Sequence, residues 1–203
     1  MRLRAALLGF GLLVLAACGG PAEPVWAPQS AVDAARFVTG NQPKITIFTV
    51  TSTRNGSGGH SGLLIDAPSE RVLFDPAGTF QVPFVPERND VHYGMTDRAV
   101  SVYIDYHARE TFDVQIQEIP LTAVQAERVK AIAESYGAVP KAQCTLSITR
   151  ILRQAGIGDF PVTYFPNSLM KAVDKVPGVT RRTISDDDAD DNHGVLFQAT
   201  QKS

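Results

Sequence analysis

Runs of β-branched and apolar residues in the first half of the chain predict strands. The longest run is Lys44–Thr51 (KITIFTVT), whose residue types are typical of a strand. His60–Asp66 (HSGLLID) follows a glycine-rich turn, and Arg71–Asp75 (RVLFD) follows a turn at Pro68-Ser69. Because this second turn is short, the two strands that it joins are expected to pair as an antiparallel hairpin.

Other segments are assigned by the spacing of their apolar residues. Ala99–Tyr106 and Thr111–Ile119 alternate apolar and polar positions, which predicts two more strands. Residues 76–97 are rich in Pro, Gly and polar groups and predict a long surface excursion. Near the C-terminus, the acidic run Asp186–Asp191 predicts a solvated loop and Val195–Ala199 a last strand.

Helical spacing appears after residue 120. Thr122 and Gln125 have the spacing of a capping box, and Gly137 should end the helix that they start. A second helix is expected to begin near Cys144 and to end at Gly156. Two shorter helices are expected, one from Ser30 to before Gly40 and one from Asn167 or Ser168 through Val173. Together these elements predict an α+β fold, an antiparallel sheet packed against helices, in a single domain of residues 30–203.

The N-terminus has the pattern of an export signal. Arg2 and Arg4 precede an apolar stretch, Ala5–Ala17, that is too short to span a bilayer. The following Leu15-Ala16-Ala17-Cys18 resembles a bacterial lipobox, in which the cysteine is lipidated and becomes the new N-terminus. Residues 1–17 are therefore expected to be a lipoprotein signal peptide, and residues 18–29 a lipidated Cys18 and flexible tether. The alternative is an ordinary secretory peptide cut near Ala17.

Export through this leader predicts a protein of the bacterial cell envelope. The lipid on Cys18 would tie the chain to a membrane, facing the periplasm or the outside. Without residues 1–17, 17 basic residues remain against 21 acidic ones, a net charge of −4, and no basic block suits nucleic acid. We expect a monomer that does not bind nucleic acid.

Several common enzyme classes lack their motifs in this sequence. Around Ser57, Asn55 stands where the first glycine of the motif should be, so no G-x-S-x-G elbow of a serine hydrolase is present. There is no H-E-x-x-H, and the acidic run lacks the spacing of a calcium loop. The glycine-rich turn lacks the Lys-Ser/Thr of a P-loop. We therefore expect no metal or other cofactor.

Cys144 is the candidate nucleophile. If Cys18 carries lipid, Cys144 has no partner for an intramolecular disulfide. An unpaired cysteine in an exported chain is an intermolecular link or a reactive thiol, and the alternative is a buried, inert one. The first turn of a helix favours the reactive thiol, because its free N–H groups and the helix dipole stabilise a thiolate.

His60 is the candidate base, and Asp75 the candidate third residue. His60 opens an apolar strand behind glycines, where backbone and substrate can approach closely. In the predicted hairpin, Asp75 falls near the His60 end and could orient the imidazole. The alternatives are a capped turn histidine and a turn aspartate. His92, in the irregular stretch, His107, at a strand end, and His193, beside the acidic run, are expected to be surface residues.

These motifs and their order resemble a known family. "HSGLLIDAPSERVLFDPAG" (60–78), followed by "QCTLSITRIL" (143–152) and "YFPNSL" (164–169), is similar to the circularly permuted, papain-like NlpC superfamily over residues 44–175. The resemblance implies a permuted papain-like fold with Cys144 as nucleophile, His60 as base and Asp75 as the orienting residue. Gln143 departs from the Asn that many relatives have before the cysteine.

The resemblance also implies chemistry through a thioester on Cys144. It predicts a lipid-anchored cysteine hydrolase, an amidase or peptidase acting on a peptide or cell-wall peptide. One alternative is an acyltransferase that uses the same residues on acylated substrates. The other is an envelope lipoprotein that keeps the scaffold and only binds a ligand.

Overall fold

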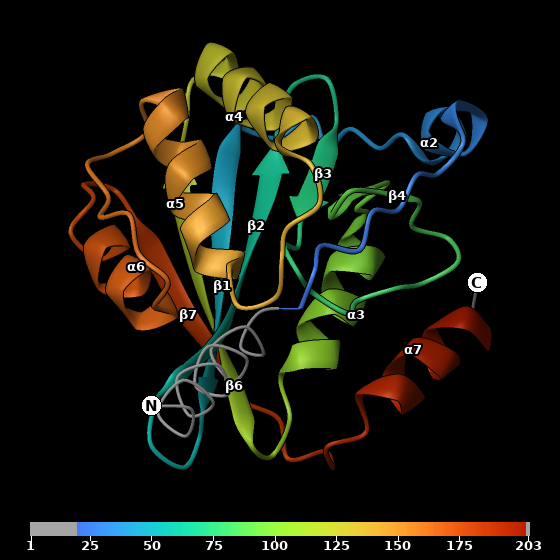
Figure 1. Ribbon diagram of the computed structural model, residues 1–203, viewed down its shortest axis with the longest axis vertical. Coiled ribbons are helices and arrows are strands. Elements are labelled where there is room, and N and C mark those ends of the chain that lie inside the picture. Colours follow the sequence, from blue (N-terminus) through green and yellow to red (C-terminus); the bar gives the residue numbers. More distant parts are fainter. Residues whose placement is uncertain (1–19, 202–203) are drawn as a thin grey trace, which may run out of the picture.

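A seven-stranded antiparallel sheet forms the centre of the computed structural model, which describes residues 20–201 (Figure 1). The strand order across the sheet is β4-β5-β3-β2-β1-β6-β7. The strands are β1 (Lys44–Ser52), β2 (Gly58–Asp66), β3 (Arg71–Phe74), β4 (Glu87–Arg88), β5 (Val91–Tyr93), β6 (Phe112–Pro120) and β7 (Thr180–Ile184). β1 and β2 are central and mostly buried, and the two longest ladders pair β1 with β2 and β1 with β6.

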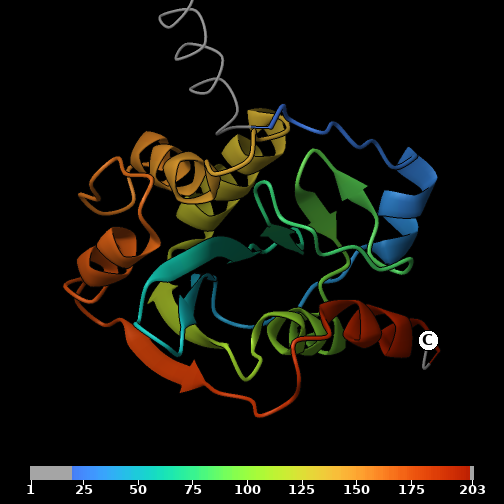
Figure 2. The ribbon, with the colours of Figure 1, turned by 60° about the horizontal axis from the view of Figure 1, so that its bottom comes forward.

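Helices cover both faces of this sheet, so the fold has three layers (Figure 2). The helices are α2 (Gln29–Ala35), α3 (Asp97–His107), α4 (Ala123–Tyr136), α5 (Cys144–Ala155), α6 (Pro166–Val173) and α7 (Asn192–Gln201). α4, α5 and α6 pack on one face, and α3 with α7 packs on the other. The described part of the chain is thus α+β with an antiparallel sheet, as the sequence predicts.

The alternation of side chains along each strand builds two cores. Ile45 and Ile47 of β1 join the core under α4–α6, whereas Phe48 joins the core under α3. In β2, Leu63 and Leu64 divide between the same two cores. Because both faces of the central strands are covered, β1 is buried along nearly its whole length, and its threonines are buried with its apolar residues.

The elements with strong local signals are where the sequence predicts them. β1, β2, β3 and β6 are confirmed, and β2 and β3 form the expected antiparallel hairpin. α4 begins at the predicted capping box, with both Thr122–Gln125 hydrogen bonds formed. α5 begins at Cys144 and ends on Gly156 in the left-handed conformation, as expected. α2 ends before Gly40 as predicted but begins without a side-chain cap.

The predicted strand at Ala99–Tyr106 is wrong, because the segment forms helix α3. Its residues also satisfy a helical period, since Ala99, Tyr103 and Tyr106 are spaced by four and three residues and are all buried. Thr96 caps the helix by accepting a hydrogen bond from the Ala99 N–H. This packing and this cap outweigh the strand preference of the alternating apolar pattern and the β-branched residues.

The C-terminal prediction is wrong as well. Val195–Ala199 is part of helix α7, whose Val195 and Ala199, one turn apart, pack on α3. The last strand is instead β7, Thr180–Ile184, which pairs with β6 at the sheet edge. β7 carries few apolar residues and is mostly exposed, so hydrophobic spacing does not reveal it.

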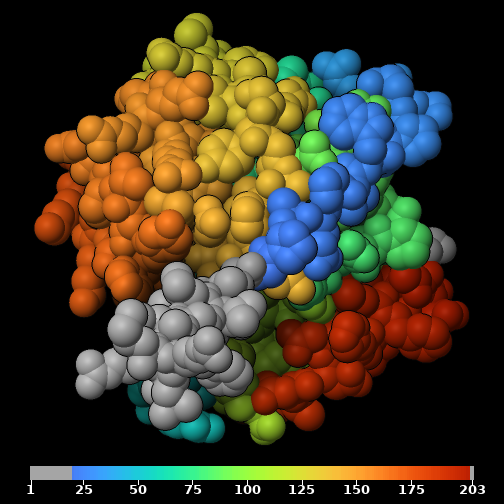
Figure 3. All heavy atoms as spheres, in the orientation of Figure 1, coloured from blue at the N-terminus to red at the C-terminus, as the bar shows by residue number. Residues whose placement is uncertain are grey.

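Residues 76–97 are not merely a surface excursion. They contain β4 and β5, and Phe80, Val91 and Met95 are buried. Part of the expected tether is also packed: residues 20–35, in blue, run along the surface (Figure 3), and the Val25 carbonyl accepts the Asn89 N–H at 3.0 Å. Trp26 forms a bridge with Arg88, whose guanidinium lies 4.6 Å from the Trp26 ring centre.

The predicted leader, residues 1–17, and the lipidation site Cys18 lie outside the described residues. Within residues 20–201, no helix is both long and apolar enough to cross a membrane.

Candidate active site

Cys144 is the first residue of α5, and the loop before it is held in place. The Val139 N–H donates to Asp90 Oδ2 at 2.7 Å, which anchors this loop to the β4–β5 turn. Ala142 then adopts φ of 67°, a left-handed conformation that is costly for a residue with a side chain. The chain therefore enters α5 abruptly, and the thiol is placed by the loop as well as by the helix.

The open edge of β2 brings Cys144 close to His60. β3 pairs with β2 only as far as Leu63, opposite Phe74, so residues 58–62 have no partner strand on that side. The start of α5 packs there, with Ser61 Oγ 3.1 Å from Thr145 Oγ1. The backbone N–H of Ser61 hydrogen-bonds to the Cys144 thiol.

The surroundings of Cys144 favour its thiolate. Burial raises the pKa of the thiol, but its hydrogen bond to His60 and the charge of that ring outweigh this effect, so the pKa is lowered. The Ser61 N–H and the Thr145 hydroxyl act in the same direction. Cys144 is buried and free, and forms no disulfide within residues 20–201.

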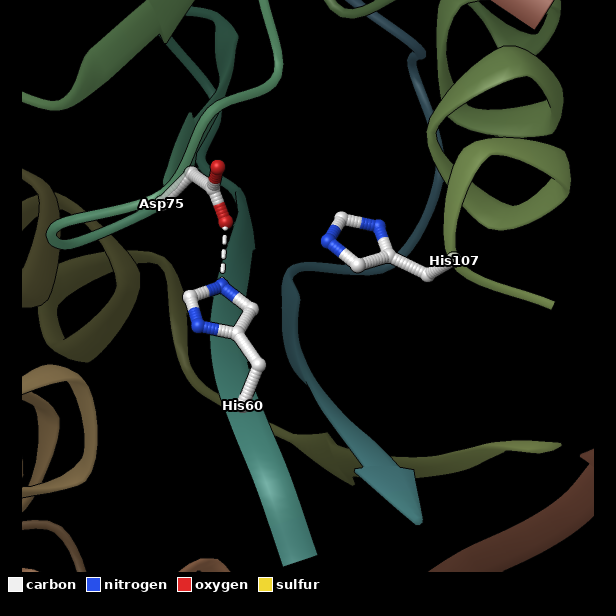
Figure 4. A group of neighbouring side chains, drawn as sticks. All are labelled: His60, Asp75 and His107. Carbon is white, nitrogen blue, oxygen red and sulfur yellow. Dashed lines mark hydrogen bonds and ion pairs between the residues drawn. The ribbon is translucent and has the colours of Figure 1, made fainter. Parts of the chain in front are cut away.

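His60 and Asp75 form a direct pair. His60 Nε2 lies 2.7 Å from Asp75 Oδ1, and the Asp75 side chain is fully buried (Figure 4). The register between β1 and β2 shifts beside Val50, where His60 pairs, which is the signature of a β-bulge. Bulges commonly re-aim a side chain next to an active site. Since Nε2 faces Asp75, Nδ1 is the nitrogen left for Cys144.

His60 and Asp75 shift each other's pKa strongly. Burial would lower the pKa of His60, but the charge of Asp75 and their hydrogen bond raise it from 6.5 to about 10. Burial likewise opposes ionisation of Asp75, yet the charge of His60 holds the pKa of Asp75 well below its usual range. At neutral pH His60 is therefore an imidazolium beside an ionised Asp75, and its charge favours the thiolate form of Cys144.

Tyr103 and His107 of α3 complete the environment. The Tyr103 hydroxyl donates to Asp75 Oδ1 at 2.7 Å. The His107 ring lies parallel to the His60 ring within 4°, with the ring centres 5.4 Å apart. Burial lowers the pKa of His107 to about 4, so this histidine is neutral at physiological pH.

A cleft of about 290 Å³ opens beside His60 and His107. Its polar wall includes Thr79 and Asn192, and its apolar wall includes Phe112. Small-molecule sites commonly measure about 300–1,000 Å³, so this cleft suits one side chain or a short polar segment.

The structure brings together the three residues selected from sequence, with Asp75 beside His60 as the hairpin predicts. Of the other histidines, His193 is exposed as expected, whereas His92 is buried and His107 is half-buried at the end of a helix. Both surface predictions are therefore wrong. Tyr103 and His107 were missed because their segment was expected to be a strand; as a helix, residues four apart share a face.

The chain matches no protein-family model, no curated protein and no solved structure. The resemblance to the NlpC superfamily therefore remains a prediction from short motifs, and function is argued from the geometry of the site.

Proposed function

We propose that this chain is a papain-like cysteine hydrolase of the cell envelope that cleaves amide bonds, with Cys144 as nucleophile, His60 as acid and base, and Asp75 as the orienting residue. The observation that carries the proposal is the placement of Cys144, the first residue of α5, against the strand whose His60 bonds to the buried Asp75 at 2.7 Å. Inert buried cysteines lack such a partner.

In the first step, the Cys144 sulfur attacks the carbonyl carbon of the substrate. The developing oxyanion can accept from the Cys144 backbone N–H, which as the first residue of α5 has no partner within the helix. His60 then gives its Nδ1 proton to the leaving amine, which departs and leaves a thioester on Cys144.

In the second step, His60 takes a proton from water, and the resulting hydroxide attacks the thioester. The carboxylic acid product leaves and the Cys144–His60 pair is restored. Asp75 keeps Nε2 hydrogen-bonded throughout, so Nδ1 stays directed at the reacting groups.

The cleft beside His60, which His60 lines but Cys144 does not, suits part of a peptide better than a long acyl chain. Its volume is modest, and polar side chains from Thr79, His107 and Asn192 line it together with apolar ones. Hydrogen-bonding groups of this kind select polar substrates, because leaving them unpaired is costly.

The test is cleavage of cell-wall peptides by the full chain, followed by mass spectrometry of the new ends. We expect Cys144→Ala and His60→Ala each to abolish product, whereas the exposed His193→Ala retains full turnover. Turnover by Cys144→Ala would end the proposal. Binding of the peptides without cleavage, equal in wild type and Cys144→Ala, would instead identify a binding protein.

A further inference from the structure

His60, Asp75 and His107 offer ligand atoms that converge on one point. One nitrogen from each imidazole and one carboxylate oxygen all lie within 4.8 Å of one another. Figure 4 shows the two rings side by side, with these atoms turned toward a common space. Two imidazoles and one carboxylate are a donor set that zinc prefers in sites with an open position.

The orientation of His107 is fixed by a second hydrogen bond. Its Nδ1 lies 2.9 Å from the Tyr103 carbonyl oxygen, which can only accept, so Nδ1 carries the proton. Nε2 therefore presents a lone pair toward His60 and Asp75 (Figure 4). Histidine ligands of metals are typically held by a hydrogen bond of this kind from the other ring nitrogen.

The two rings need a small movement to share an ion. Their planes are parallel within 4° and their centres lie 5.4 Å apart. An imidazole binds a metal in the plane of its ring, so the His107 ring must shift or tilt for both lone pairs to reach one ion. Both residues line the cleft, which gives an ion a route from solvent and room for a water as fourth ligand.

We propose that His60, Asp75 and His107 form a binding site for a divalent cation of the zinc class. Metal–ligand bonds of about 2.0–2.2 Å require tetrahedral ligand atoms roughly 3.4 Å apart. The His60–Asp75 contact of 2.7 Å therefore widens and His107 moves in. The proton on His60 Nε2 leaves to solvent as the nitrogen binds the ion, and no oxidation state changes.

Binding of the ion would replace the His60–Asp75 hydrogen bond and fill the cleft. If the proposed function holds, zinc is therefore an inhibitor of turnover. The site itself rests only on the geometry of the three ligands, so it can be tested without a substrate.

A second acidic cluster, Asp105, Asp186 and Asp188, also has ligand atoms close together. Arg109 already pairs with both Asp105 and Asp188 in that cluster. Two of its three carboxylates are thus already engaged within the protein, and no other observation points to a ligand there, so the cluster carries no proposal.

The test is titration of the metal-free full chain with Zn²⁺ against a chromophoric indicator. We expect one tight site in the wild type, weakened at least about tenfold in His107→Ala and in Asp75→Asn. The exposed His193→Ala and the thiol variant Cys144→Ser should keep the wild-type affinity. If His107→Ala fails to fold, as judged by circular dichroism, His107→Gln and Asp75→Asn carry the test.

Wild-type affinity in a folded His107 variant would overturn the site. A tenfold loss in Cys144→Ser would also overturn it, because the ion would then be bound by the thiol. Zinc binding that depends on His107, in a protein that cleaves no peptide, would leave the site standing and refute only the proposed function.

Discussion

At the scale of residues, Asp75 is the anchor of the candidate site. Its Oδ1 accepts from both His60 and the Tyr103 hydroxyl, each at 2.7 Å, in a fully buried position. A buried carboxylate is tolerated only when it is paired and hydrogen-bonded. Tyr103 therefore supports the charge on Asp75, which in turn supports the imidazolium of His60.

Replacing Tyr103 with Phe should lower the free energy of unfolding by about 1.5–3 kcal/mol, since a hydrogen bond to a buried charge is lost. Tyr106→Phe is the matched control on the same helix, because its hydroxyl bonds to the neutral Thr79 at 2.7 Å. Urea unfolding at pH 7 measures both. An equal or smaller cost for Tyr103→Phe would show that Asp75 does not depend on this hydroxyl.

At the scale of elements, the close packing of β2 against α3 places these residues. A Cβ added at Gly62 would lie 2.2 Å from the Tyr103 hydroxyl oxygen, so only glycine allows this approach. β2 thus runs near enough to α3 for Tyr103 to reach Asp75.

Gly62→Ala should destabilise the fold by about 1–3 kcal/mol through overpacking and should displace Tyr103. Gly59→Ala is the control in the same strand, because its added Cβ would meet Phe112 at 3.5 Å and the Val50 carbonyl oxygen at 3.9 Å, both ordinary contacts. Thermal unfolding compares the two variants. The packing account fails if Gly62→Ala unfolds at the same temperature as Gly59→Ala.

Element by element, sequence reasoning succeeded where the signal is local. The capping box of α4, the glycine end of α5 and the short turn between β2 and β3 all act within a few residues. Those elements carry Cys144, His60 and Asp75, so this part of the site was predictable. α3 was not, because its alternating apolar residues fit a strand, and tertiary packing together with the Thr96 cap selects the helix. Because Tyr103 and His107 lie on α3, the sequence did not predict that they would belong to the site.

At the scale of the whole molecule, the candidate site is assembled from all three layers. Cys144 comes from α5 on one face of the sheet, His60 from β2 within it, and Tyr103 and His107 from α3 on the other face. Two histidines in the α3 half have lowered pKa values, the half-buried His107 and the buried His92, whose Nδ1 has no partner among the described residues. The pH dependence of stability should reflect them.

Burial lowers the pKa of His92 from 6.5 to about 4. Between these values the unfolded chain binds a proton that the folded chain does not, so stability should fall as the pH drops from 6.5 to 4. His92→Phe removes this titration, and the loss of unfolding free energy between pH 6.5 and 4.5 should shrink, whereas His193→Ala should leave it unchanged. The same loss in His92→Phe as in wild type would contradict the prediction.

The most direct test of the proposed nucleophile is the pH dependence of Cys144 alkylation by iodoacetamide in the folded full chain, followed on the Cys144 peptide by mass spectrometry. The lowered pKa of the thiol predicts a rate whose inflection lies below that of a free cysteine. In His60→Ala, the inflection should move up toward about 8.5, the value of a free cysteine. A wild-type inflection near that value, or a thiol that does not react until the protein unfolds, would contradict the assignment of Cys144 as nucleophile.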